Sequence, residues 1–194
     1  MDGDNLPVSA FKDNADGQWE LGASAYEKRG IAVMVPSWNS ATCVQCNTCA
    51  FVCSHATIRP YLLTSEEATK VESLGAATLA VKNPKLAQYK FTLSVSAMDC
   101  TGCGECTTVC PTKSLTMVPQ ESRVATQPQW DYLFENVSKK PEVDSLPLSP
   151  MSSQFNQPLL EFSGSCAGCA ETSYARLVTQ LFGEQMYISN ATGC

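Results

Sequence analysis

The sequence lacks the features that mark a membrane protein, a secreted protein or a nucleic-acid-binding protein. No stretch approaches the roughly 20 apolar residues that a membrane-spanning helix requires. The first residues, MDGDNLPVSAF, contain neither the basic segment nor the apolar segment of a secretory signal. Lysine and arginine do not cluster, and the formal net charge is −6, whereas contacts to nucleic-acid phosphates need a basic patch. We therefore expect neither a membrane nor a nucleic-acid partner.

Familiar catalytic motifs are also missing. The sequence contains a single histidine, and it has no Ser-His-Asp set, no phosphate-binding glycine loop and no dinucleotide fingerprint. We therefore assign no catalytic residue.

Cysteine is the residue that the sequence does have in excess. Eleven cysteines, an odd number, occur without an export signal. This combination indicates a reducing compartment, and it favours metal binding over a disulfide framework. We expect the cytoplasm, with the hydrogenosome or another anaerobic organelle as the alternative.

Eight of the cysteines form two runs with one spacing. Residues 43–53 read CVQCNTCAFVC, and residues 100–111 read CTGCGECTTVCP. The spacing C-x2-C-x2-C-x3-C is typical of two-cluster bacterial ferredoxins, in which the fourth cysteine of each run binds the other cluster. The predicted ligands of one [4Fe-4S] cluster are Cys43, Cys46, Cys49 and Cys110, and those of the second are Cys100, Cys103, Cys106 and Cys53.

Other residues of the runs have predicted supporting roles. We expect Gly102 and Gly104 to let backbone amides approach the sulfurs. Ser54 stands where the first run would normally carry proline, which is not a ligand. We expect His55 to pack or to form a hydrogen bond, because thiolates already saturate the clusters.

Two other interpretations of the runs are weaker. Four-cysteine zinc sites more often use two C-x2-C pairs separated by a longer loop. A disulfide scaffold would leave one thiol unpaired. The duplicated spacing fits ferredoxins better than either.

The remaining sequence predicts few regular elements. Strands are expected at 30–36, 89–95 and 114–118, and a helix is expected to begin near Thr64, which with Glu67 forms a capping box. Residues 119–160, with several prolines and little periodicity, predict a linker or strap. A helix at 172–183 with Gly183 at its C-cap and a strand at MYIS (186–189) follow. Because these two elements cannot bury an apolar face alone, we expect the chain to stop inside a domain.

The last three cysteines are ambiguous by spacing alone. Cys166 and Cys169 form a C-x2-C pair that suits a redox pair, half a zinc site or two buried thiols. With Cys194 they would leave a metal site one ligand short.

The whole sequence resembles one family. LPVSAF, AYEKRGIAV, the two cysteine runs and GSCAGCAETSYARLVTQLFGEQMYISNATGC occur in the order and approximate spacing found in pyruvate:ferredoxin (flavodoxin) oxidoreductases. The resemblance implies that Cys166, Cys169 and Cys194 bind a third [4Fe-4S] cluster near thiamine diphosphate, with a fourth cysteine elsewhere. It also implies that Glu171 and Cys194 contact that cofactor. Ala170 replaces the usual glycine of this motif.

The resemblance further implies an α+β architecture in four parts. An N-terminal EKR-type segment (1–36) wraps onto a ferredoxin-like dicluster domain (37–120). A linker (121–160) leads to the truncated start of a thiamine-diphosphate-binding α/β domain (161–194).

The activity implied by the resemblance is oxidative decarboxylation of pyruvate with coenzyme A. This segment would relay electrons from the thiamine adduct through the clusters to an external ferredoxin or flavodoxin, and it would not be catalytically competent alone. The third cluster, thiamine diphosphate and magnesium belong to the complete enzyme, which is expected to be a homodimer. The alternatives are a free-standing two-cluster ferredoxin and, less well supported, a zinc-stabilised module.

Overall fold

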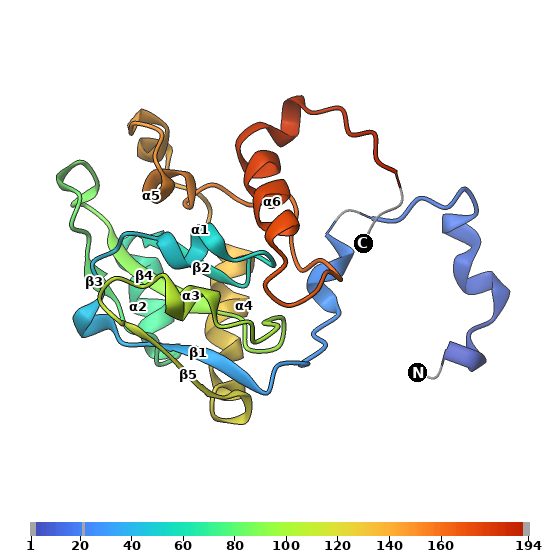
Figure 1. Ribbon diagram of the computed structural model, residues 1–194, viewed down its shortest axis with the longest axis horizontal. Helices are drawn as coiled ribbons and strands as arrows, with labels where there is room; N and C mark the ends of the chain where they lie inside the picture. The colour runs from blue at the N-terminus through green and yellow to red at the C-terminus, as the bar shows by residue number, and fades with distance from the viewer. Residues whose placement is uncertain (1–2, 21, 192–194) are drawn as a thin grey trace.

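The computed structural model describes residues 3–20 and 22–191, which form an α+β structure (Figure 1). The strands are β1 (Met34–Trp38), β2 (Ile58–Leu63), β3 (Leu79–Ala80), β4 (Lys90–Val95) and β5 (Leu115–Pro119). The α-helices are α1 (Thr48–Val52), α2 (Ser65–Ser73), α3 (Glu105–Thr108), α4 (Gln127–Asn136), α5 (Pro150–Ser153) and α6 (Ala170–Phe182). Short 3₁₀ helices lie at Gly3–Asn5, Val8–Asn14, Ala23–Tyr26, Ser40–Thr42, Pro84–Leu86, Gln120–Ser122, Val124–Thr126, Pro141–Ser145 and Gly183–Gln185.

Two antiparallel sheets hold the cysteine runs together. One sheet pairs β1 with β5, and the other has the order β2-β4-β3. The first run lies between β1 and β2, and the second lies between β4 and β5. β1, which precedes the first run, pairs with β5, which follows the second run, and Trp38 lies opposite Leu115. β4, which precedes the second run, pairs with β2, which follows the first run, and Ile58 lies opposite Val95. This crossed pairing brings α1 and α3, one from each run, into contact (Figure 1).

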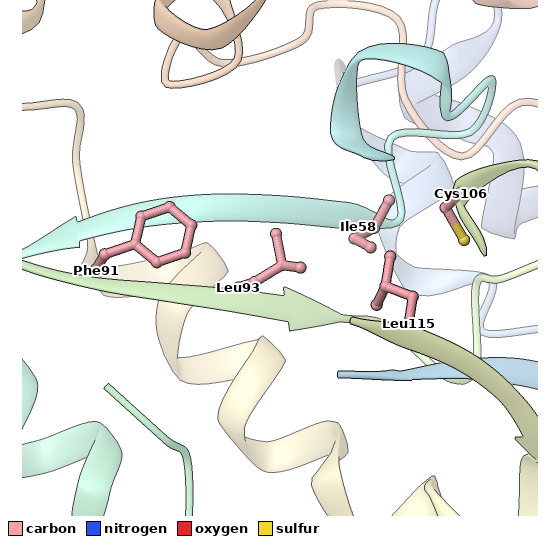
Figure 2. Packing of buried hydrophobic residues seen from close by; sticks show 5 residues of the cluster. All are labelled: Ile58, Phe91, Leu93, Cys106 and Leu115. Atoms are coloured by element: carbon pink, nitrogen blue, oxygen red, sulfur yellow. The ribbon is translucent and has the colours of Figure 1, made fainter. Parts of the chain in front are cut away.

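The main hydrophobic core lies directly beneath the runs. Its buried members come from both sheets and from the second run (Figure 2): Ile58, Phe91, Leu93, Cys106 and Leu115. Cys43, Cys49 and Cys53 are partly buried against the same cluster. The core and the cysteine loops are therefore one packing unit.

Several predicted elements are confirmed. α2 begins after Thr64, and the capping box with Glu67 is present in both directions. β4, β5 and α6 lie where strands and a helix were predicted, and Gly183 is the C-cap of α6. The first strand is shifted, since β1 begins at Met34 rather than near residue 30.

One helix was not predicted, and one predicted strand is absent. The segment predicted as a linker or strap contains α4, whose Trp130 and Leu133 are fully buried. Leu133 packs with α2, and Trp130 packs with Phe162, because tertiary contacts stabilise a segment with weak local signals. Residues 186–189 form no strand, and Tyr187 and Ile188 are exposed, with no neighbouring strand in the described part of the chain to pair with.

Residues 28–30 contact the segment directly before the second run. The Lys28 ammonium lies 2.7 Å from the Asp99 carboxylate, and the Gly30 amide donates a 2.8 Å hydrogen bond to the Met98 carbonyl. Residues 3–20 extend away from the rest of the molecule (Figure 1). No helix in residues 3–20 and 22–191 combines the length and apolar character needed to cross a membrane.

Candidate iron–sulfur site

The two cysteine loops repeat one backbone conformation. Positive φ angles occur two and four residues after the first cysteine of each run, at Gln45 (60°) and Asn47 (58°) and at Gly102 (74°) and Gly104 (81°). Glycine adopts this left-handed region freely, whereas other residues pay for it in steric strain. The second run therefore meets the requirement with glycine, and the first run must compensate for it.

Hydrogen bonds from both buried side chains provide that compensation. The Gln45 side chain donates to the Ala80 carbonyl (2.8 Å) and accepts from the Lys82 amide (2.9 Å). The Asn47 side chain donates to the Met151 carbonyl (2.9 Å). The first loop is thus held in shape by chain segments that are distant in the sequence.

The eight cysteines of the runs line two cavities, four to each cavity. One cavity is lined by Cys43, Cys46, Cys49 and Cys110. The other is lined by Cys53, Cys100, Cys103 and Cys106. Each cavity therefore takes three cysteines from one run and the fourth cysteine of the other run, which is the exchange that the ferredoxin spacing predicts.

Burial and neighbouring sulfurs both raise the pKa values of several of these thiols. Cys46, Cys43 and Cys110 raise the pKa of Cys49, and Cys53 raises the pKa values of Cys100, Cys103 and Cys106. Cys49 also raises the pKa of Cys106, so the two sets lie close enough to influence one another. All the described cysteines are free thiols.

Backbone amides and hydroxyl groups point at several of the sulfurs. The Gln45 amide donates a hydrogen bond to the Cys43 sulfur, and the Gly102 amide donates one to the Cys100 sulfur, each with a length of 3.4 Å. The Ser114 amide donates a 3.2 Å hydrogen bond to the Cys110 sulfur. The Thr48 hydroxyl also donates to Cys46 at 3.3 Å. The expectation that Gly102 lets an amide approach a sulfur is confirmed. These donors stabilise negative charge on sulfur and tune the potential of a bound cluster.

Burial makes several of the thiols weak acids, whereas hydrogen bonds from the Ser114 and Thr112 amides lower the pKa of Cys110. Burial raises the pKa of Cys49 to about 12 and that of Cys100 to about 11, and it also raises the pKa of Cys106. Neutral thiols are poor ligands, whereas a bound metal deprotonates them. We therefore expect these buried cysteines to lose their protons only when they bind metal.

The donor set and its layout fit two [4Fe-4S] clusters. Each cavity offers four sulfurs and an apolar surround, and hydrogen-bond donors reach the sulfurs. Within residues 3–20 and 22–191, no three His, Cys, Asp or Glu side chains are grouped closely enough to hold a single metal ion directly. The two sets are defined by the cavities that they line, and ligation itself stays a prediction.

The third cysteine motif lies against the second loop. A Cβ added at Gly168 would lie 3.2 Å from the Cβ of Cys103, so residues 166–169 contact the loop of the second run. Cys166 is exposed, and Cys169 precedes α6 as its N-cap. The pKa of Cys169 is lowered because Thr172 donates hydrogen bonds to its sulfur.

The other predicted cofactor contacts are only partly described. Glu171 is exposed in the first turn of α6. Cys194 lies outside the described residues. The structure therefore places two of the three predicted ligands of a third cluster beside the second run.

His55 links the second cavity to the third motif. It lines that cavity, and one ring nitrogen lies 3.0 Å from the Ser54 hydroxyl. The other lies 3.0 Å from the Ser165 carbonyl, next to Cys166. Burial lowers the pKa of His55. The expectation of a hydrogen-bonded histidine is confirmed.

Sequence reasoning missed the buried polar face of α6. Thr172, Arg176 and Gln180 are its buried residues, and Arg176 is only 1% exposed. Their spacing of four residues was the available signal, since it places all three on one helix face. Arg176 therefore lies buried between α6 and α1.

Comparisons with known proteins agree with the cysteine geometry. A family model described as a 4Fe-4S dicluster domain matches residues 42–114, and one described as a domain of unknown function (EKR) matches residues 1–32. A pyruvate:ferredoxin oxidoreductase of Moorella thermoacetica and a pyruvate-flavodoxin oxidoreductase of Enterobacter agglomerans are each 48% identical over 100% of this chain. The chain corresponds to one segment of these oxidoreductases.

The match covers only a small part of the pyruvate:ferredoxin and pyruvate-flavodoxin oxidoreductases. The chain spans 16% of the length of each of these two relatives. A pyruvate dehydrogenase [NADP(+)] of Cryptosporidium parvum is 43% identical over 100% of the chain, which spans 10% of it. The chain thus carries a 4Fe-4S dicluster domain, and the relatives that it matches are much longer proteins.

Proposed function

We propose that this chain is the electron-transfer segment of a pyruvate:ferredoxin (flavodoxin) oxidoreductase. Such an enzyme would convert pyruvate, coenzyme A and an oxidised carrier to acetyl-CoA, carbon dioxide and the reduced carrier. The observation that carries the proposal is the division of eight cysteines between two cavities, each with one cysteine from the opposite run.

In this proposal the chain binds two clusters through interleaved ligands. The first set is Cys43, Cys46, Cys49 and Cys110, and the second set is Cys100, Cys103, Cys106 and Cys53. A [4Fe-4S] cluster supplies one-electron chemistry when it is bound. The protein would hold the thiolates against the core beneath them and direct backbone amides at their sulfurs.

We extend the proposal to a third cluster and to thiamine diphosphate in the complete enzyme. Cys166, Cys169 and Cys194 would be three ligands of that cluster, and Glu171 and Cys194 would contact thiamine diphosphate, which magnesium would help bind. The contact between Gly168 and Cys103 supports this arrangement, because it places the third motif next to the second ligand set.

The proposed context is an enzyme with further domains. α6 exposes the apolar side chains Tyr174, Val178 and Phe182, which suits coverage by the rest of a thiamine-diphosphate-binding domain. The contacts of Lys28 and Gly30 support a wrapping role for residues 1–36. The domain limits 37–120, 121–160 and 161–194 stay predictions, as do a homodimer, a ferredoxin or flavodoxin acceptor, and an anaerobic setting in the cytoplasm.

Anaerobic reconstitution with iron and sulfide tests the proposal. We expect about eight iron atoms per chain, brown colour, and cubane EPR signals after reduction with dithionite. Serine in place of one crossed ligand should affect the opposite set: Cys53→Ser should disturb the cluster of the second run, and Cys110→Ser that of the first. Cys166→Ser, outside both sets, is the matched control and should leave both signals unchanged.

Two results would reject the proposal. One is a colourless protein that binds zinc stoichiometrically and gives no cubane signal. The other is loss of the first-run cluster, rather than the second-run cluster, in Cys53→Ser. The second result would keep iron–sulfur binding and remove the interleaving.

A further inference from the structure

Arg176 is a buried cation that holds α6 against the first cysteine run. Its guanidinium donates to the carbonyls of Ala50 (3.2 Å) and Phe51 (2.7 Å), at the end of α1. It also donates to the side-chain oxygen of Gln180 (2.9 Å) and contacts that of Gln154 (3.5 Å). All these partners are neutral oxygens.

No carboxylate meets this charge in the part of the chain that the structure describes. The other buried arginine differs, because the Arg59 guanidinium lies 3.0 Å from the Glu161 carboxylate and against three aromatic rings. Burial lowers the pKa of Arg176, and the positive charge of Arg59 lowers it further. An arginine nevertheless stays protonated in proteins, and a buried charge without a counter-ion is costly. The carbonyls that Arg176 contacts belong to the last residues of α1, and Cys53 follows directly as the C-cap of that helix. The nearest group that could become negatively charged along this segment is therefore a cysteine ligand of the first run.

We propose that Arg176 is a positioning residue that raises the reduction potential of the cluster bound through Cys53. The inference rests on the proposed function, since it requires that cluster. Four thiolates give a bound cluster net negative charge, and one-electron reduction adds one more. A fixed cation nearby, in a medium of low dielectric constant, stabilises the reduced form more than the oxidised form.

The position of Arg176 determines which cluster its charge would influence. α6 begins directly after Cys169, so the helix that follows the third motif also carries the cation to the end of α1, which Cys53 follows. The helix would thereby favour electrons arriving at the second ligand set.

Redox titration of the reconstituted 194-residue chain, followed by EPR, tests the inference. We expect Arg176→Gln, which keeps hydrogen-bond donors without the charge, to disfavour reduction of the Cys53 cluster about tenfold, a shift of about 59 mV to lower potential. Arg176→Lys keeps the charge and should retain most of the wild-type potential. The cluster is identified by its sensitivity to Cys53→Ser.

The outcomes separate this inference from the proposed function. Absence of any cubane signal in the wild-type chain would reject the proposed function. Normal clusters with an unchanged potential in Arg176→Gln, or equal shifts in the glutamine and lysine variants, would overturn the role of the charge.

A second measurement applies if Arg176→Gln fails to retain its clusters. The unfolding of the cluster-free chain should then be unaffected or shifted to higher denaturant by Arg176→Gln, because an uncompensated buried charge is removed. A large loss of stability in the cluster-free chain would assign Arg176 to docking α6 alone and overturn the inference.

Discussion

Gly102 shows how closely the chain approaches the second cysteine loop. Its φ angle is 74°, and an added Cβ would lie 2.9 Å from the Met34 carbonyl oxygen and 3.2 Å from the Ala32 Cβ. Backbone atoms cannot move aside as a flexible side chain can. Any larger residue here would push β1 away from the loop whose amide approaches the Cys100 sulfur.

We therefore expect Gly102→Ala to destabilise the reconstituted chain by more than about 2 kcal/mol, the upper range of the left-handed strain alone. Anaerobic chemical denaturation measures the change. Gly104→Ala is the matched control, because its φ angle is similar but the nearest atom to its Cβ is Thr107 Oγ1 at 4.0 Å. Equal losses in the two variants would show that the contact with β1 contributes nothing.

The first loop solves the same problem with different side chains. Gln45 and Asn47 adopt positive φ angles and recover the cost through hydrogen bonds to residues 80–82 and 151. Sequence reasoning identified the glycines of the second loop because glycine is the usual residue for this conformation. The first loop gave no such signal, since its partners are remote in the sequence.

At the scale of secondary-structure elements, α4 shows that residues 121–160 include a helix packed against the rest of the molecule. Trp130 is fully buried, stacks near Phe134 with ring centroids 6.3 Å apart, and lies under the Arg59 guanidinium. A helix in a linker would have no such contacts.

Trp130→Ala should accordingly cost about 3–5 kcal/mol of unfolding free energy, as for other large buried aromatic side chains. Glu135→Ala, an exposed position on the same helix, should change stability by less than about 0.5 kcal/mol. Denaturant titration of the two variants compares them directly. A neutral Trp130→Ala would restore the linker interpretation.

The predicted elements were those whose signals are local. The capping box at Thr64 and Glu67 and the alternation of β4 depend on neighbouring residues, and both were identified. β2 was missed, because Pro60 lies within it and proline argues against a central strand. The strand is at the edge of its sheet, where proline is tolerated.

The candidate site shows the same limit. The ligand spacing in each run was readable, and the four-to-a-cavity grouping agrees with it. The spacing of Thr172, Arg176 and Gln180 places them on one face of α6, but nothing in the sequence indicates that this face meets α1. Long-range packing decides such features.

For the molecule as a whole, the cysteine loops and the core are one unit, so metal should contribute to folding. Removing iron with a chelator under anaerobic conditions should lower the melting temperature and weaken the cooperativity of unfolding, because binding free energy adds to folding free energy. Circular dichroism before and after chelation measures this, with re-addition of iron and sulfide as the control. An unchanged melting temperature would mean that the loops hold their shape without metal.

The crossed strand pairing also has a consequence for biosynthesis. Residues 43–53 leave the ribosome well before Cys110, and β1 must wait for β5, some 80 residues later in the chain. If the crossed cysteines are ligands, a nascent chain offers the first cluster only three of its four sulfurs until the second loop has emerged. Iron delivery would then follow translation of both loops, and premature stalling between them would leave a thiol-rich peptide open to oxidation.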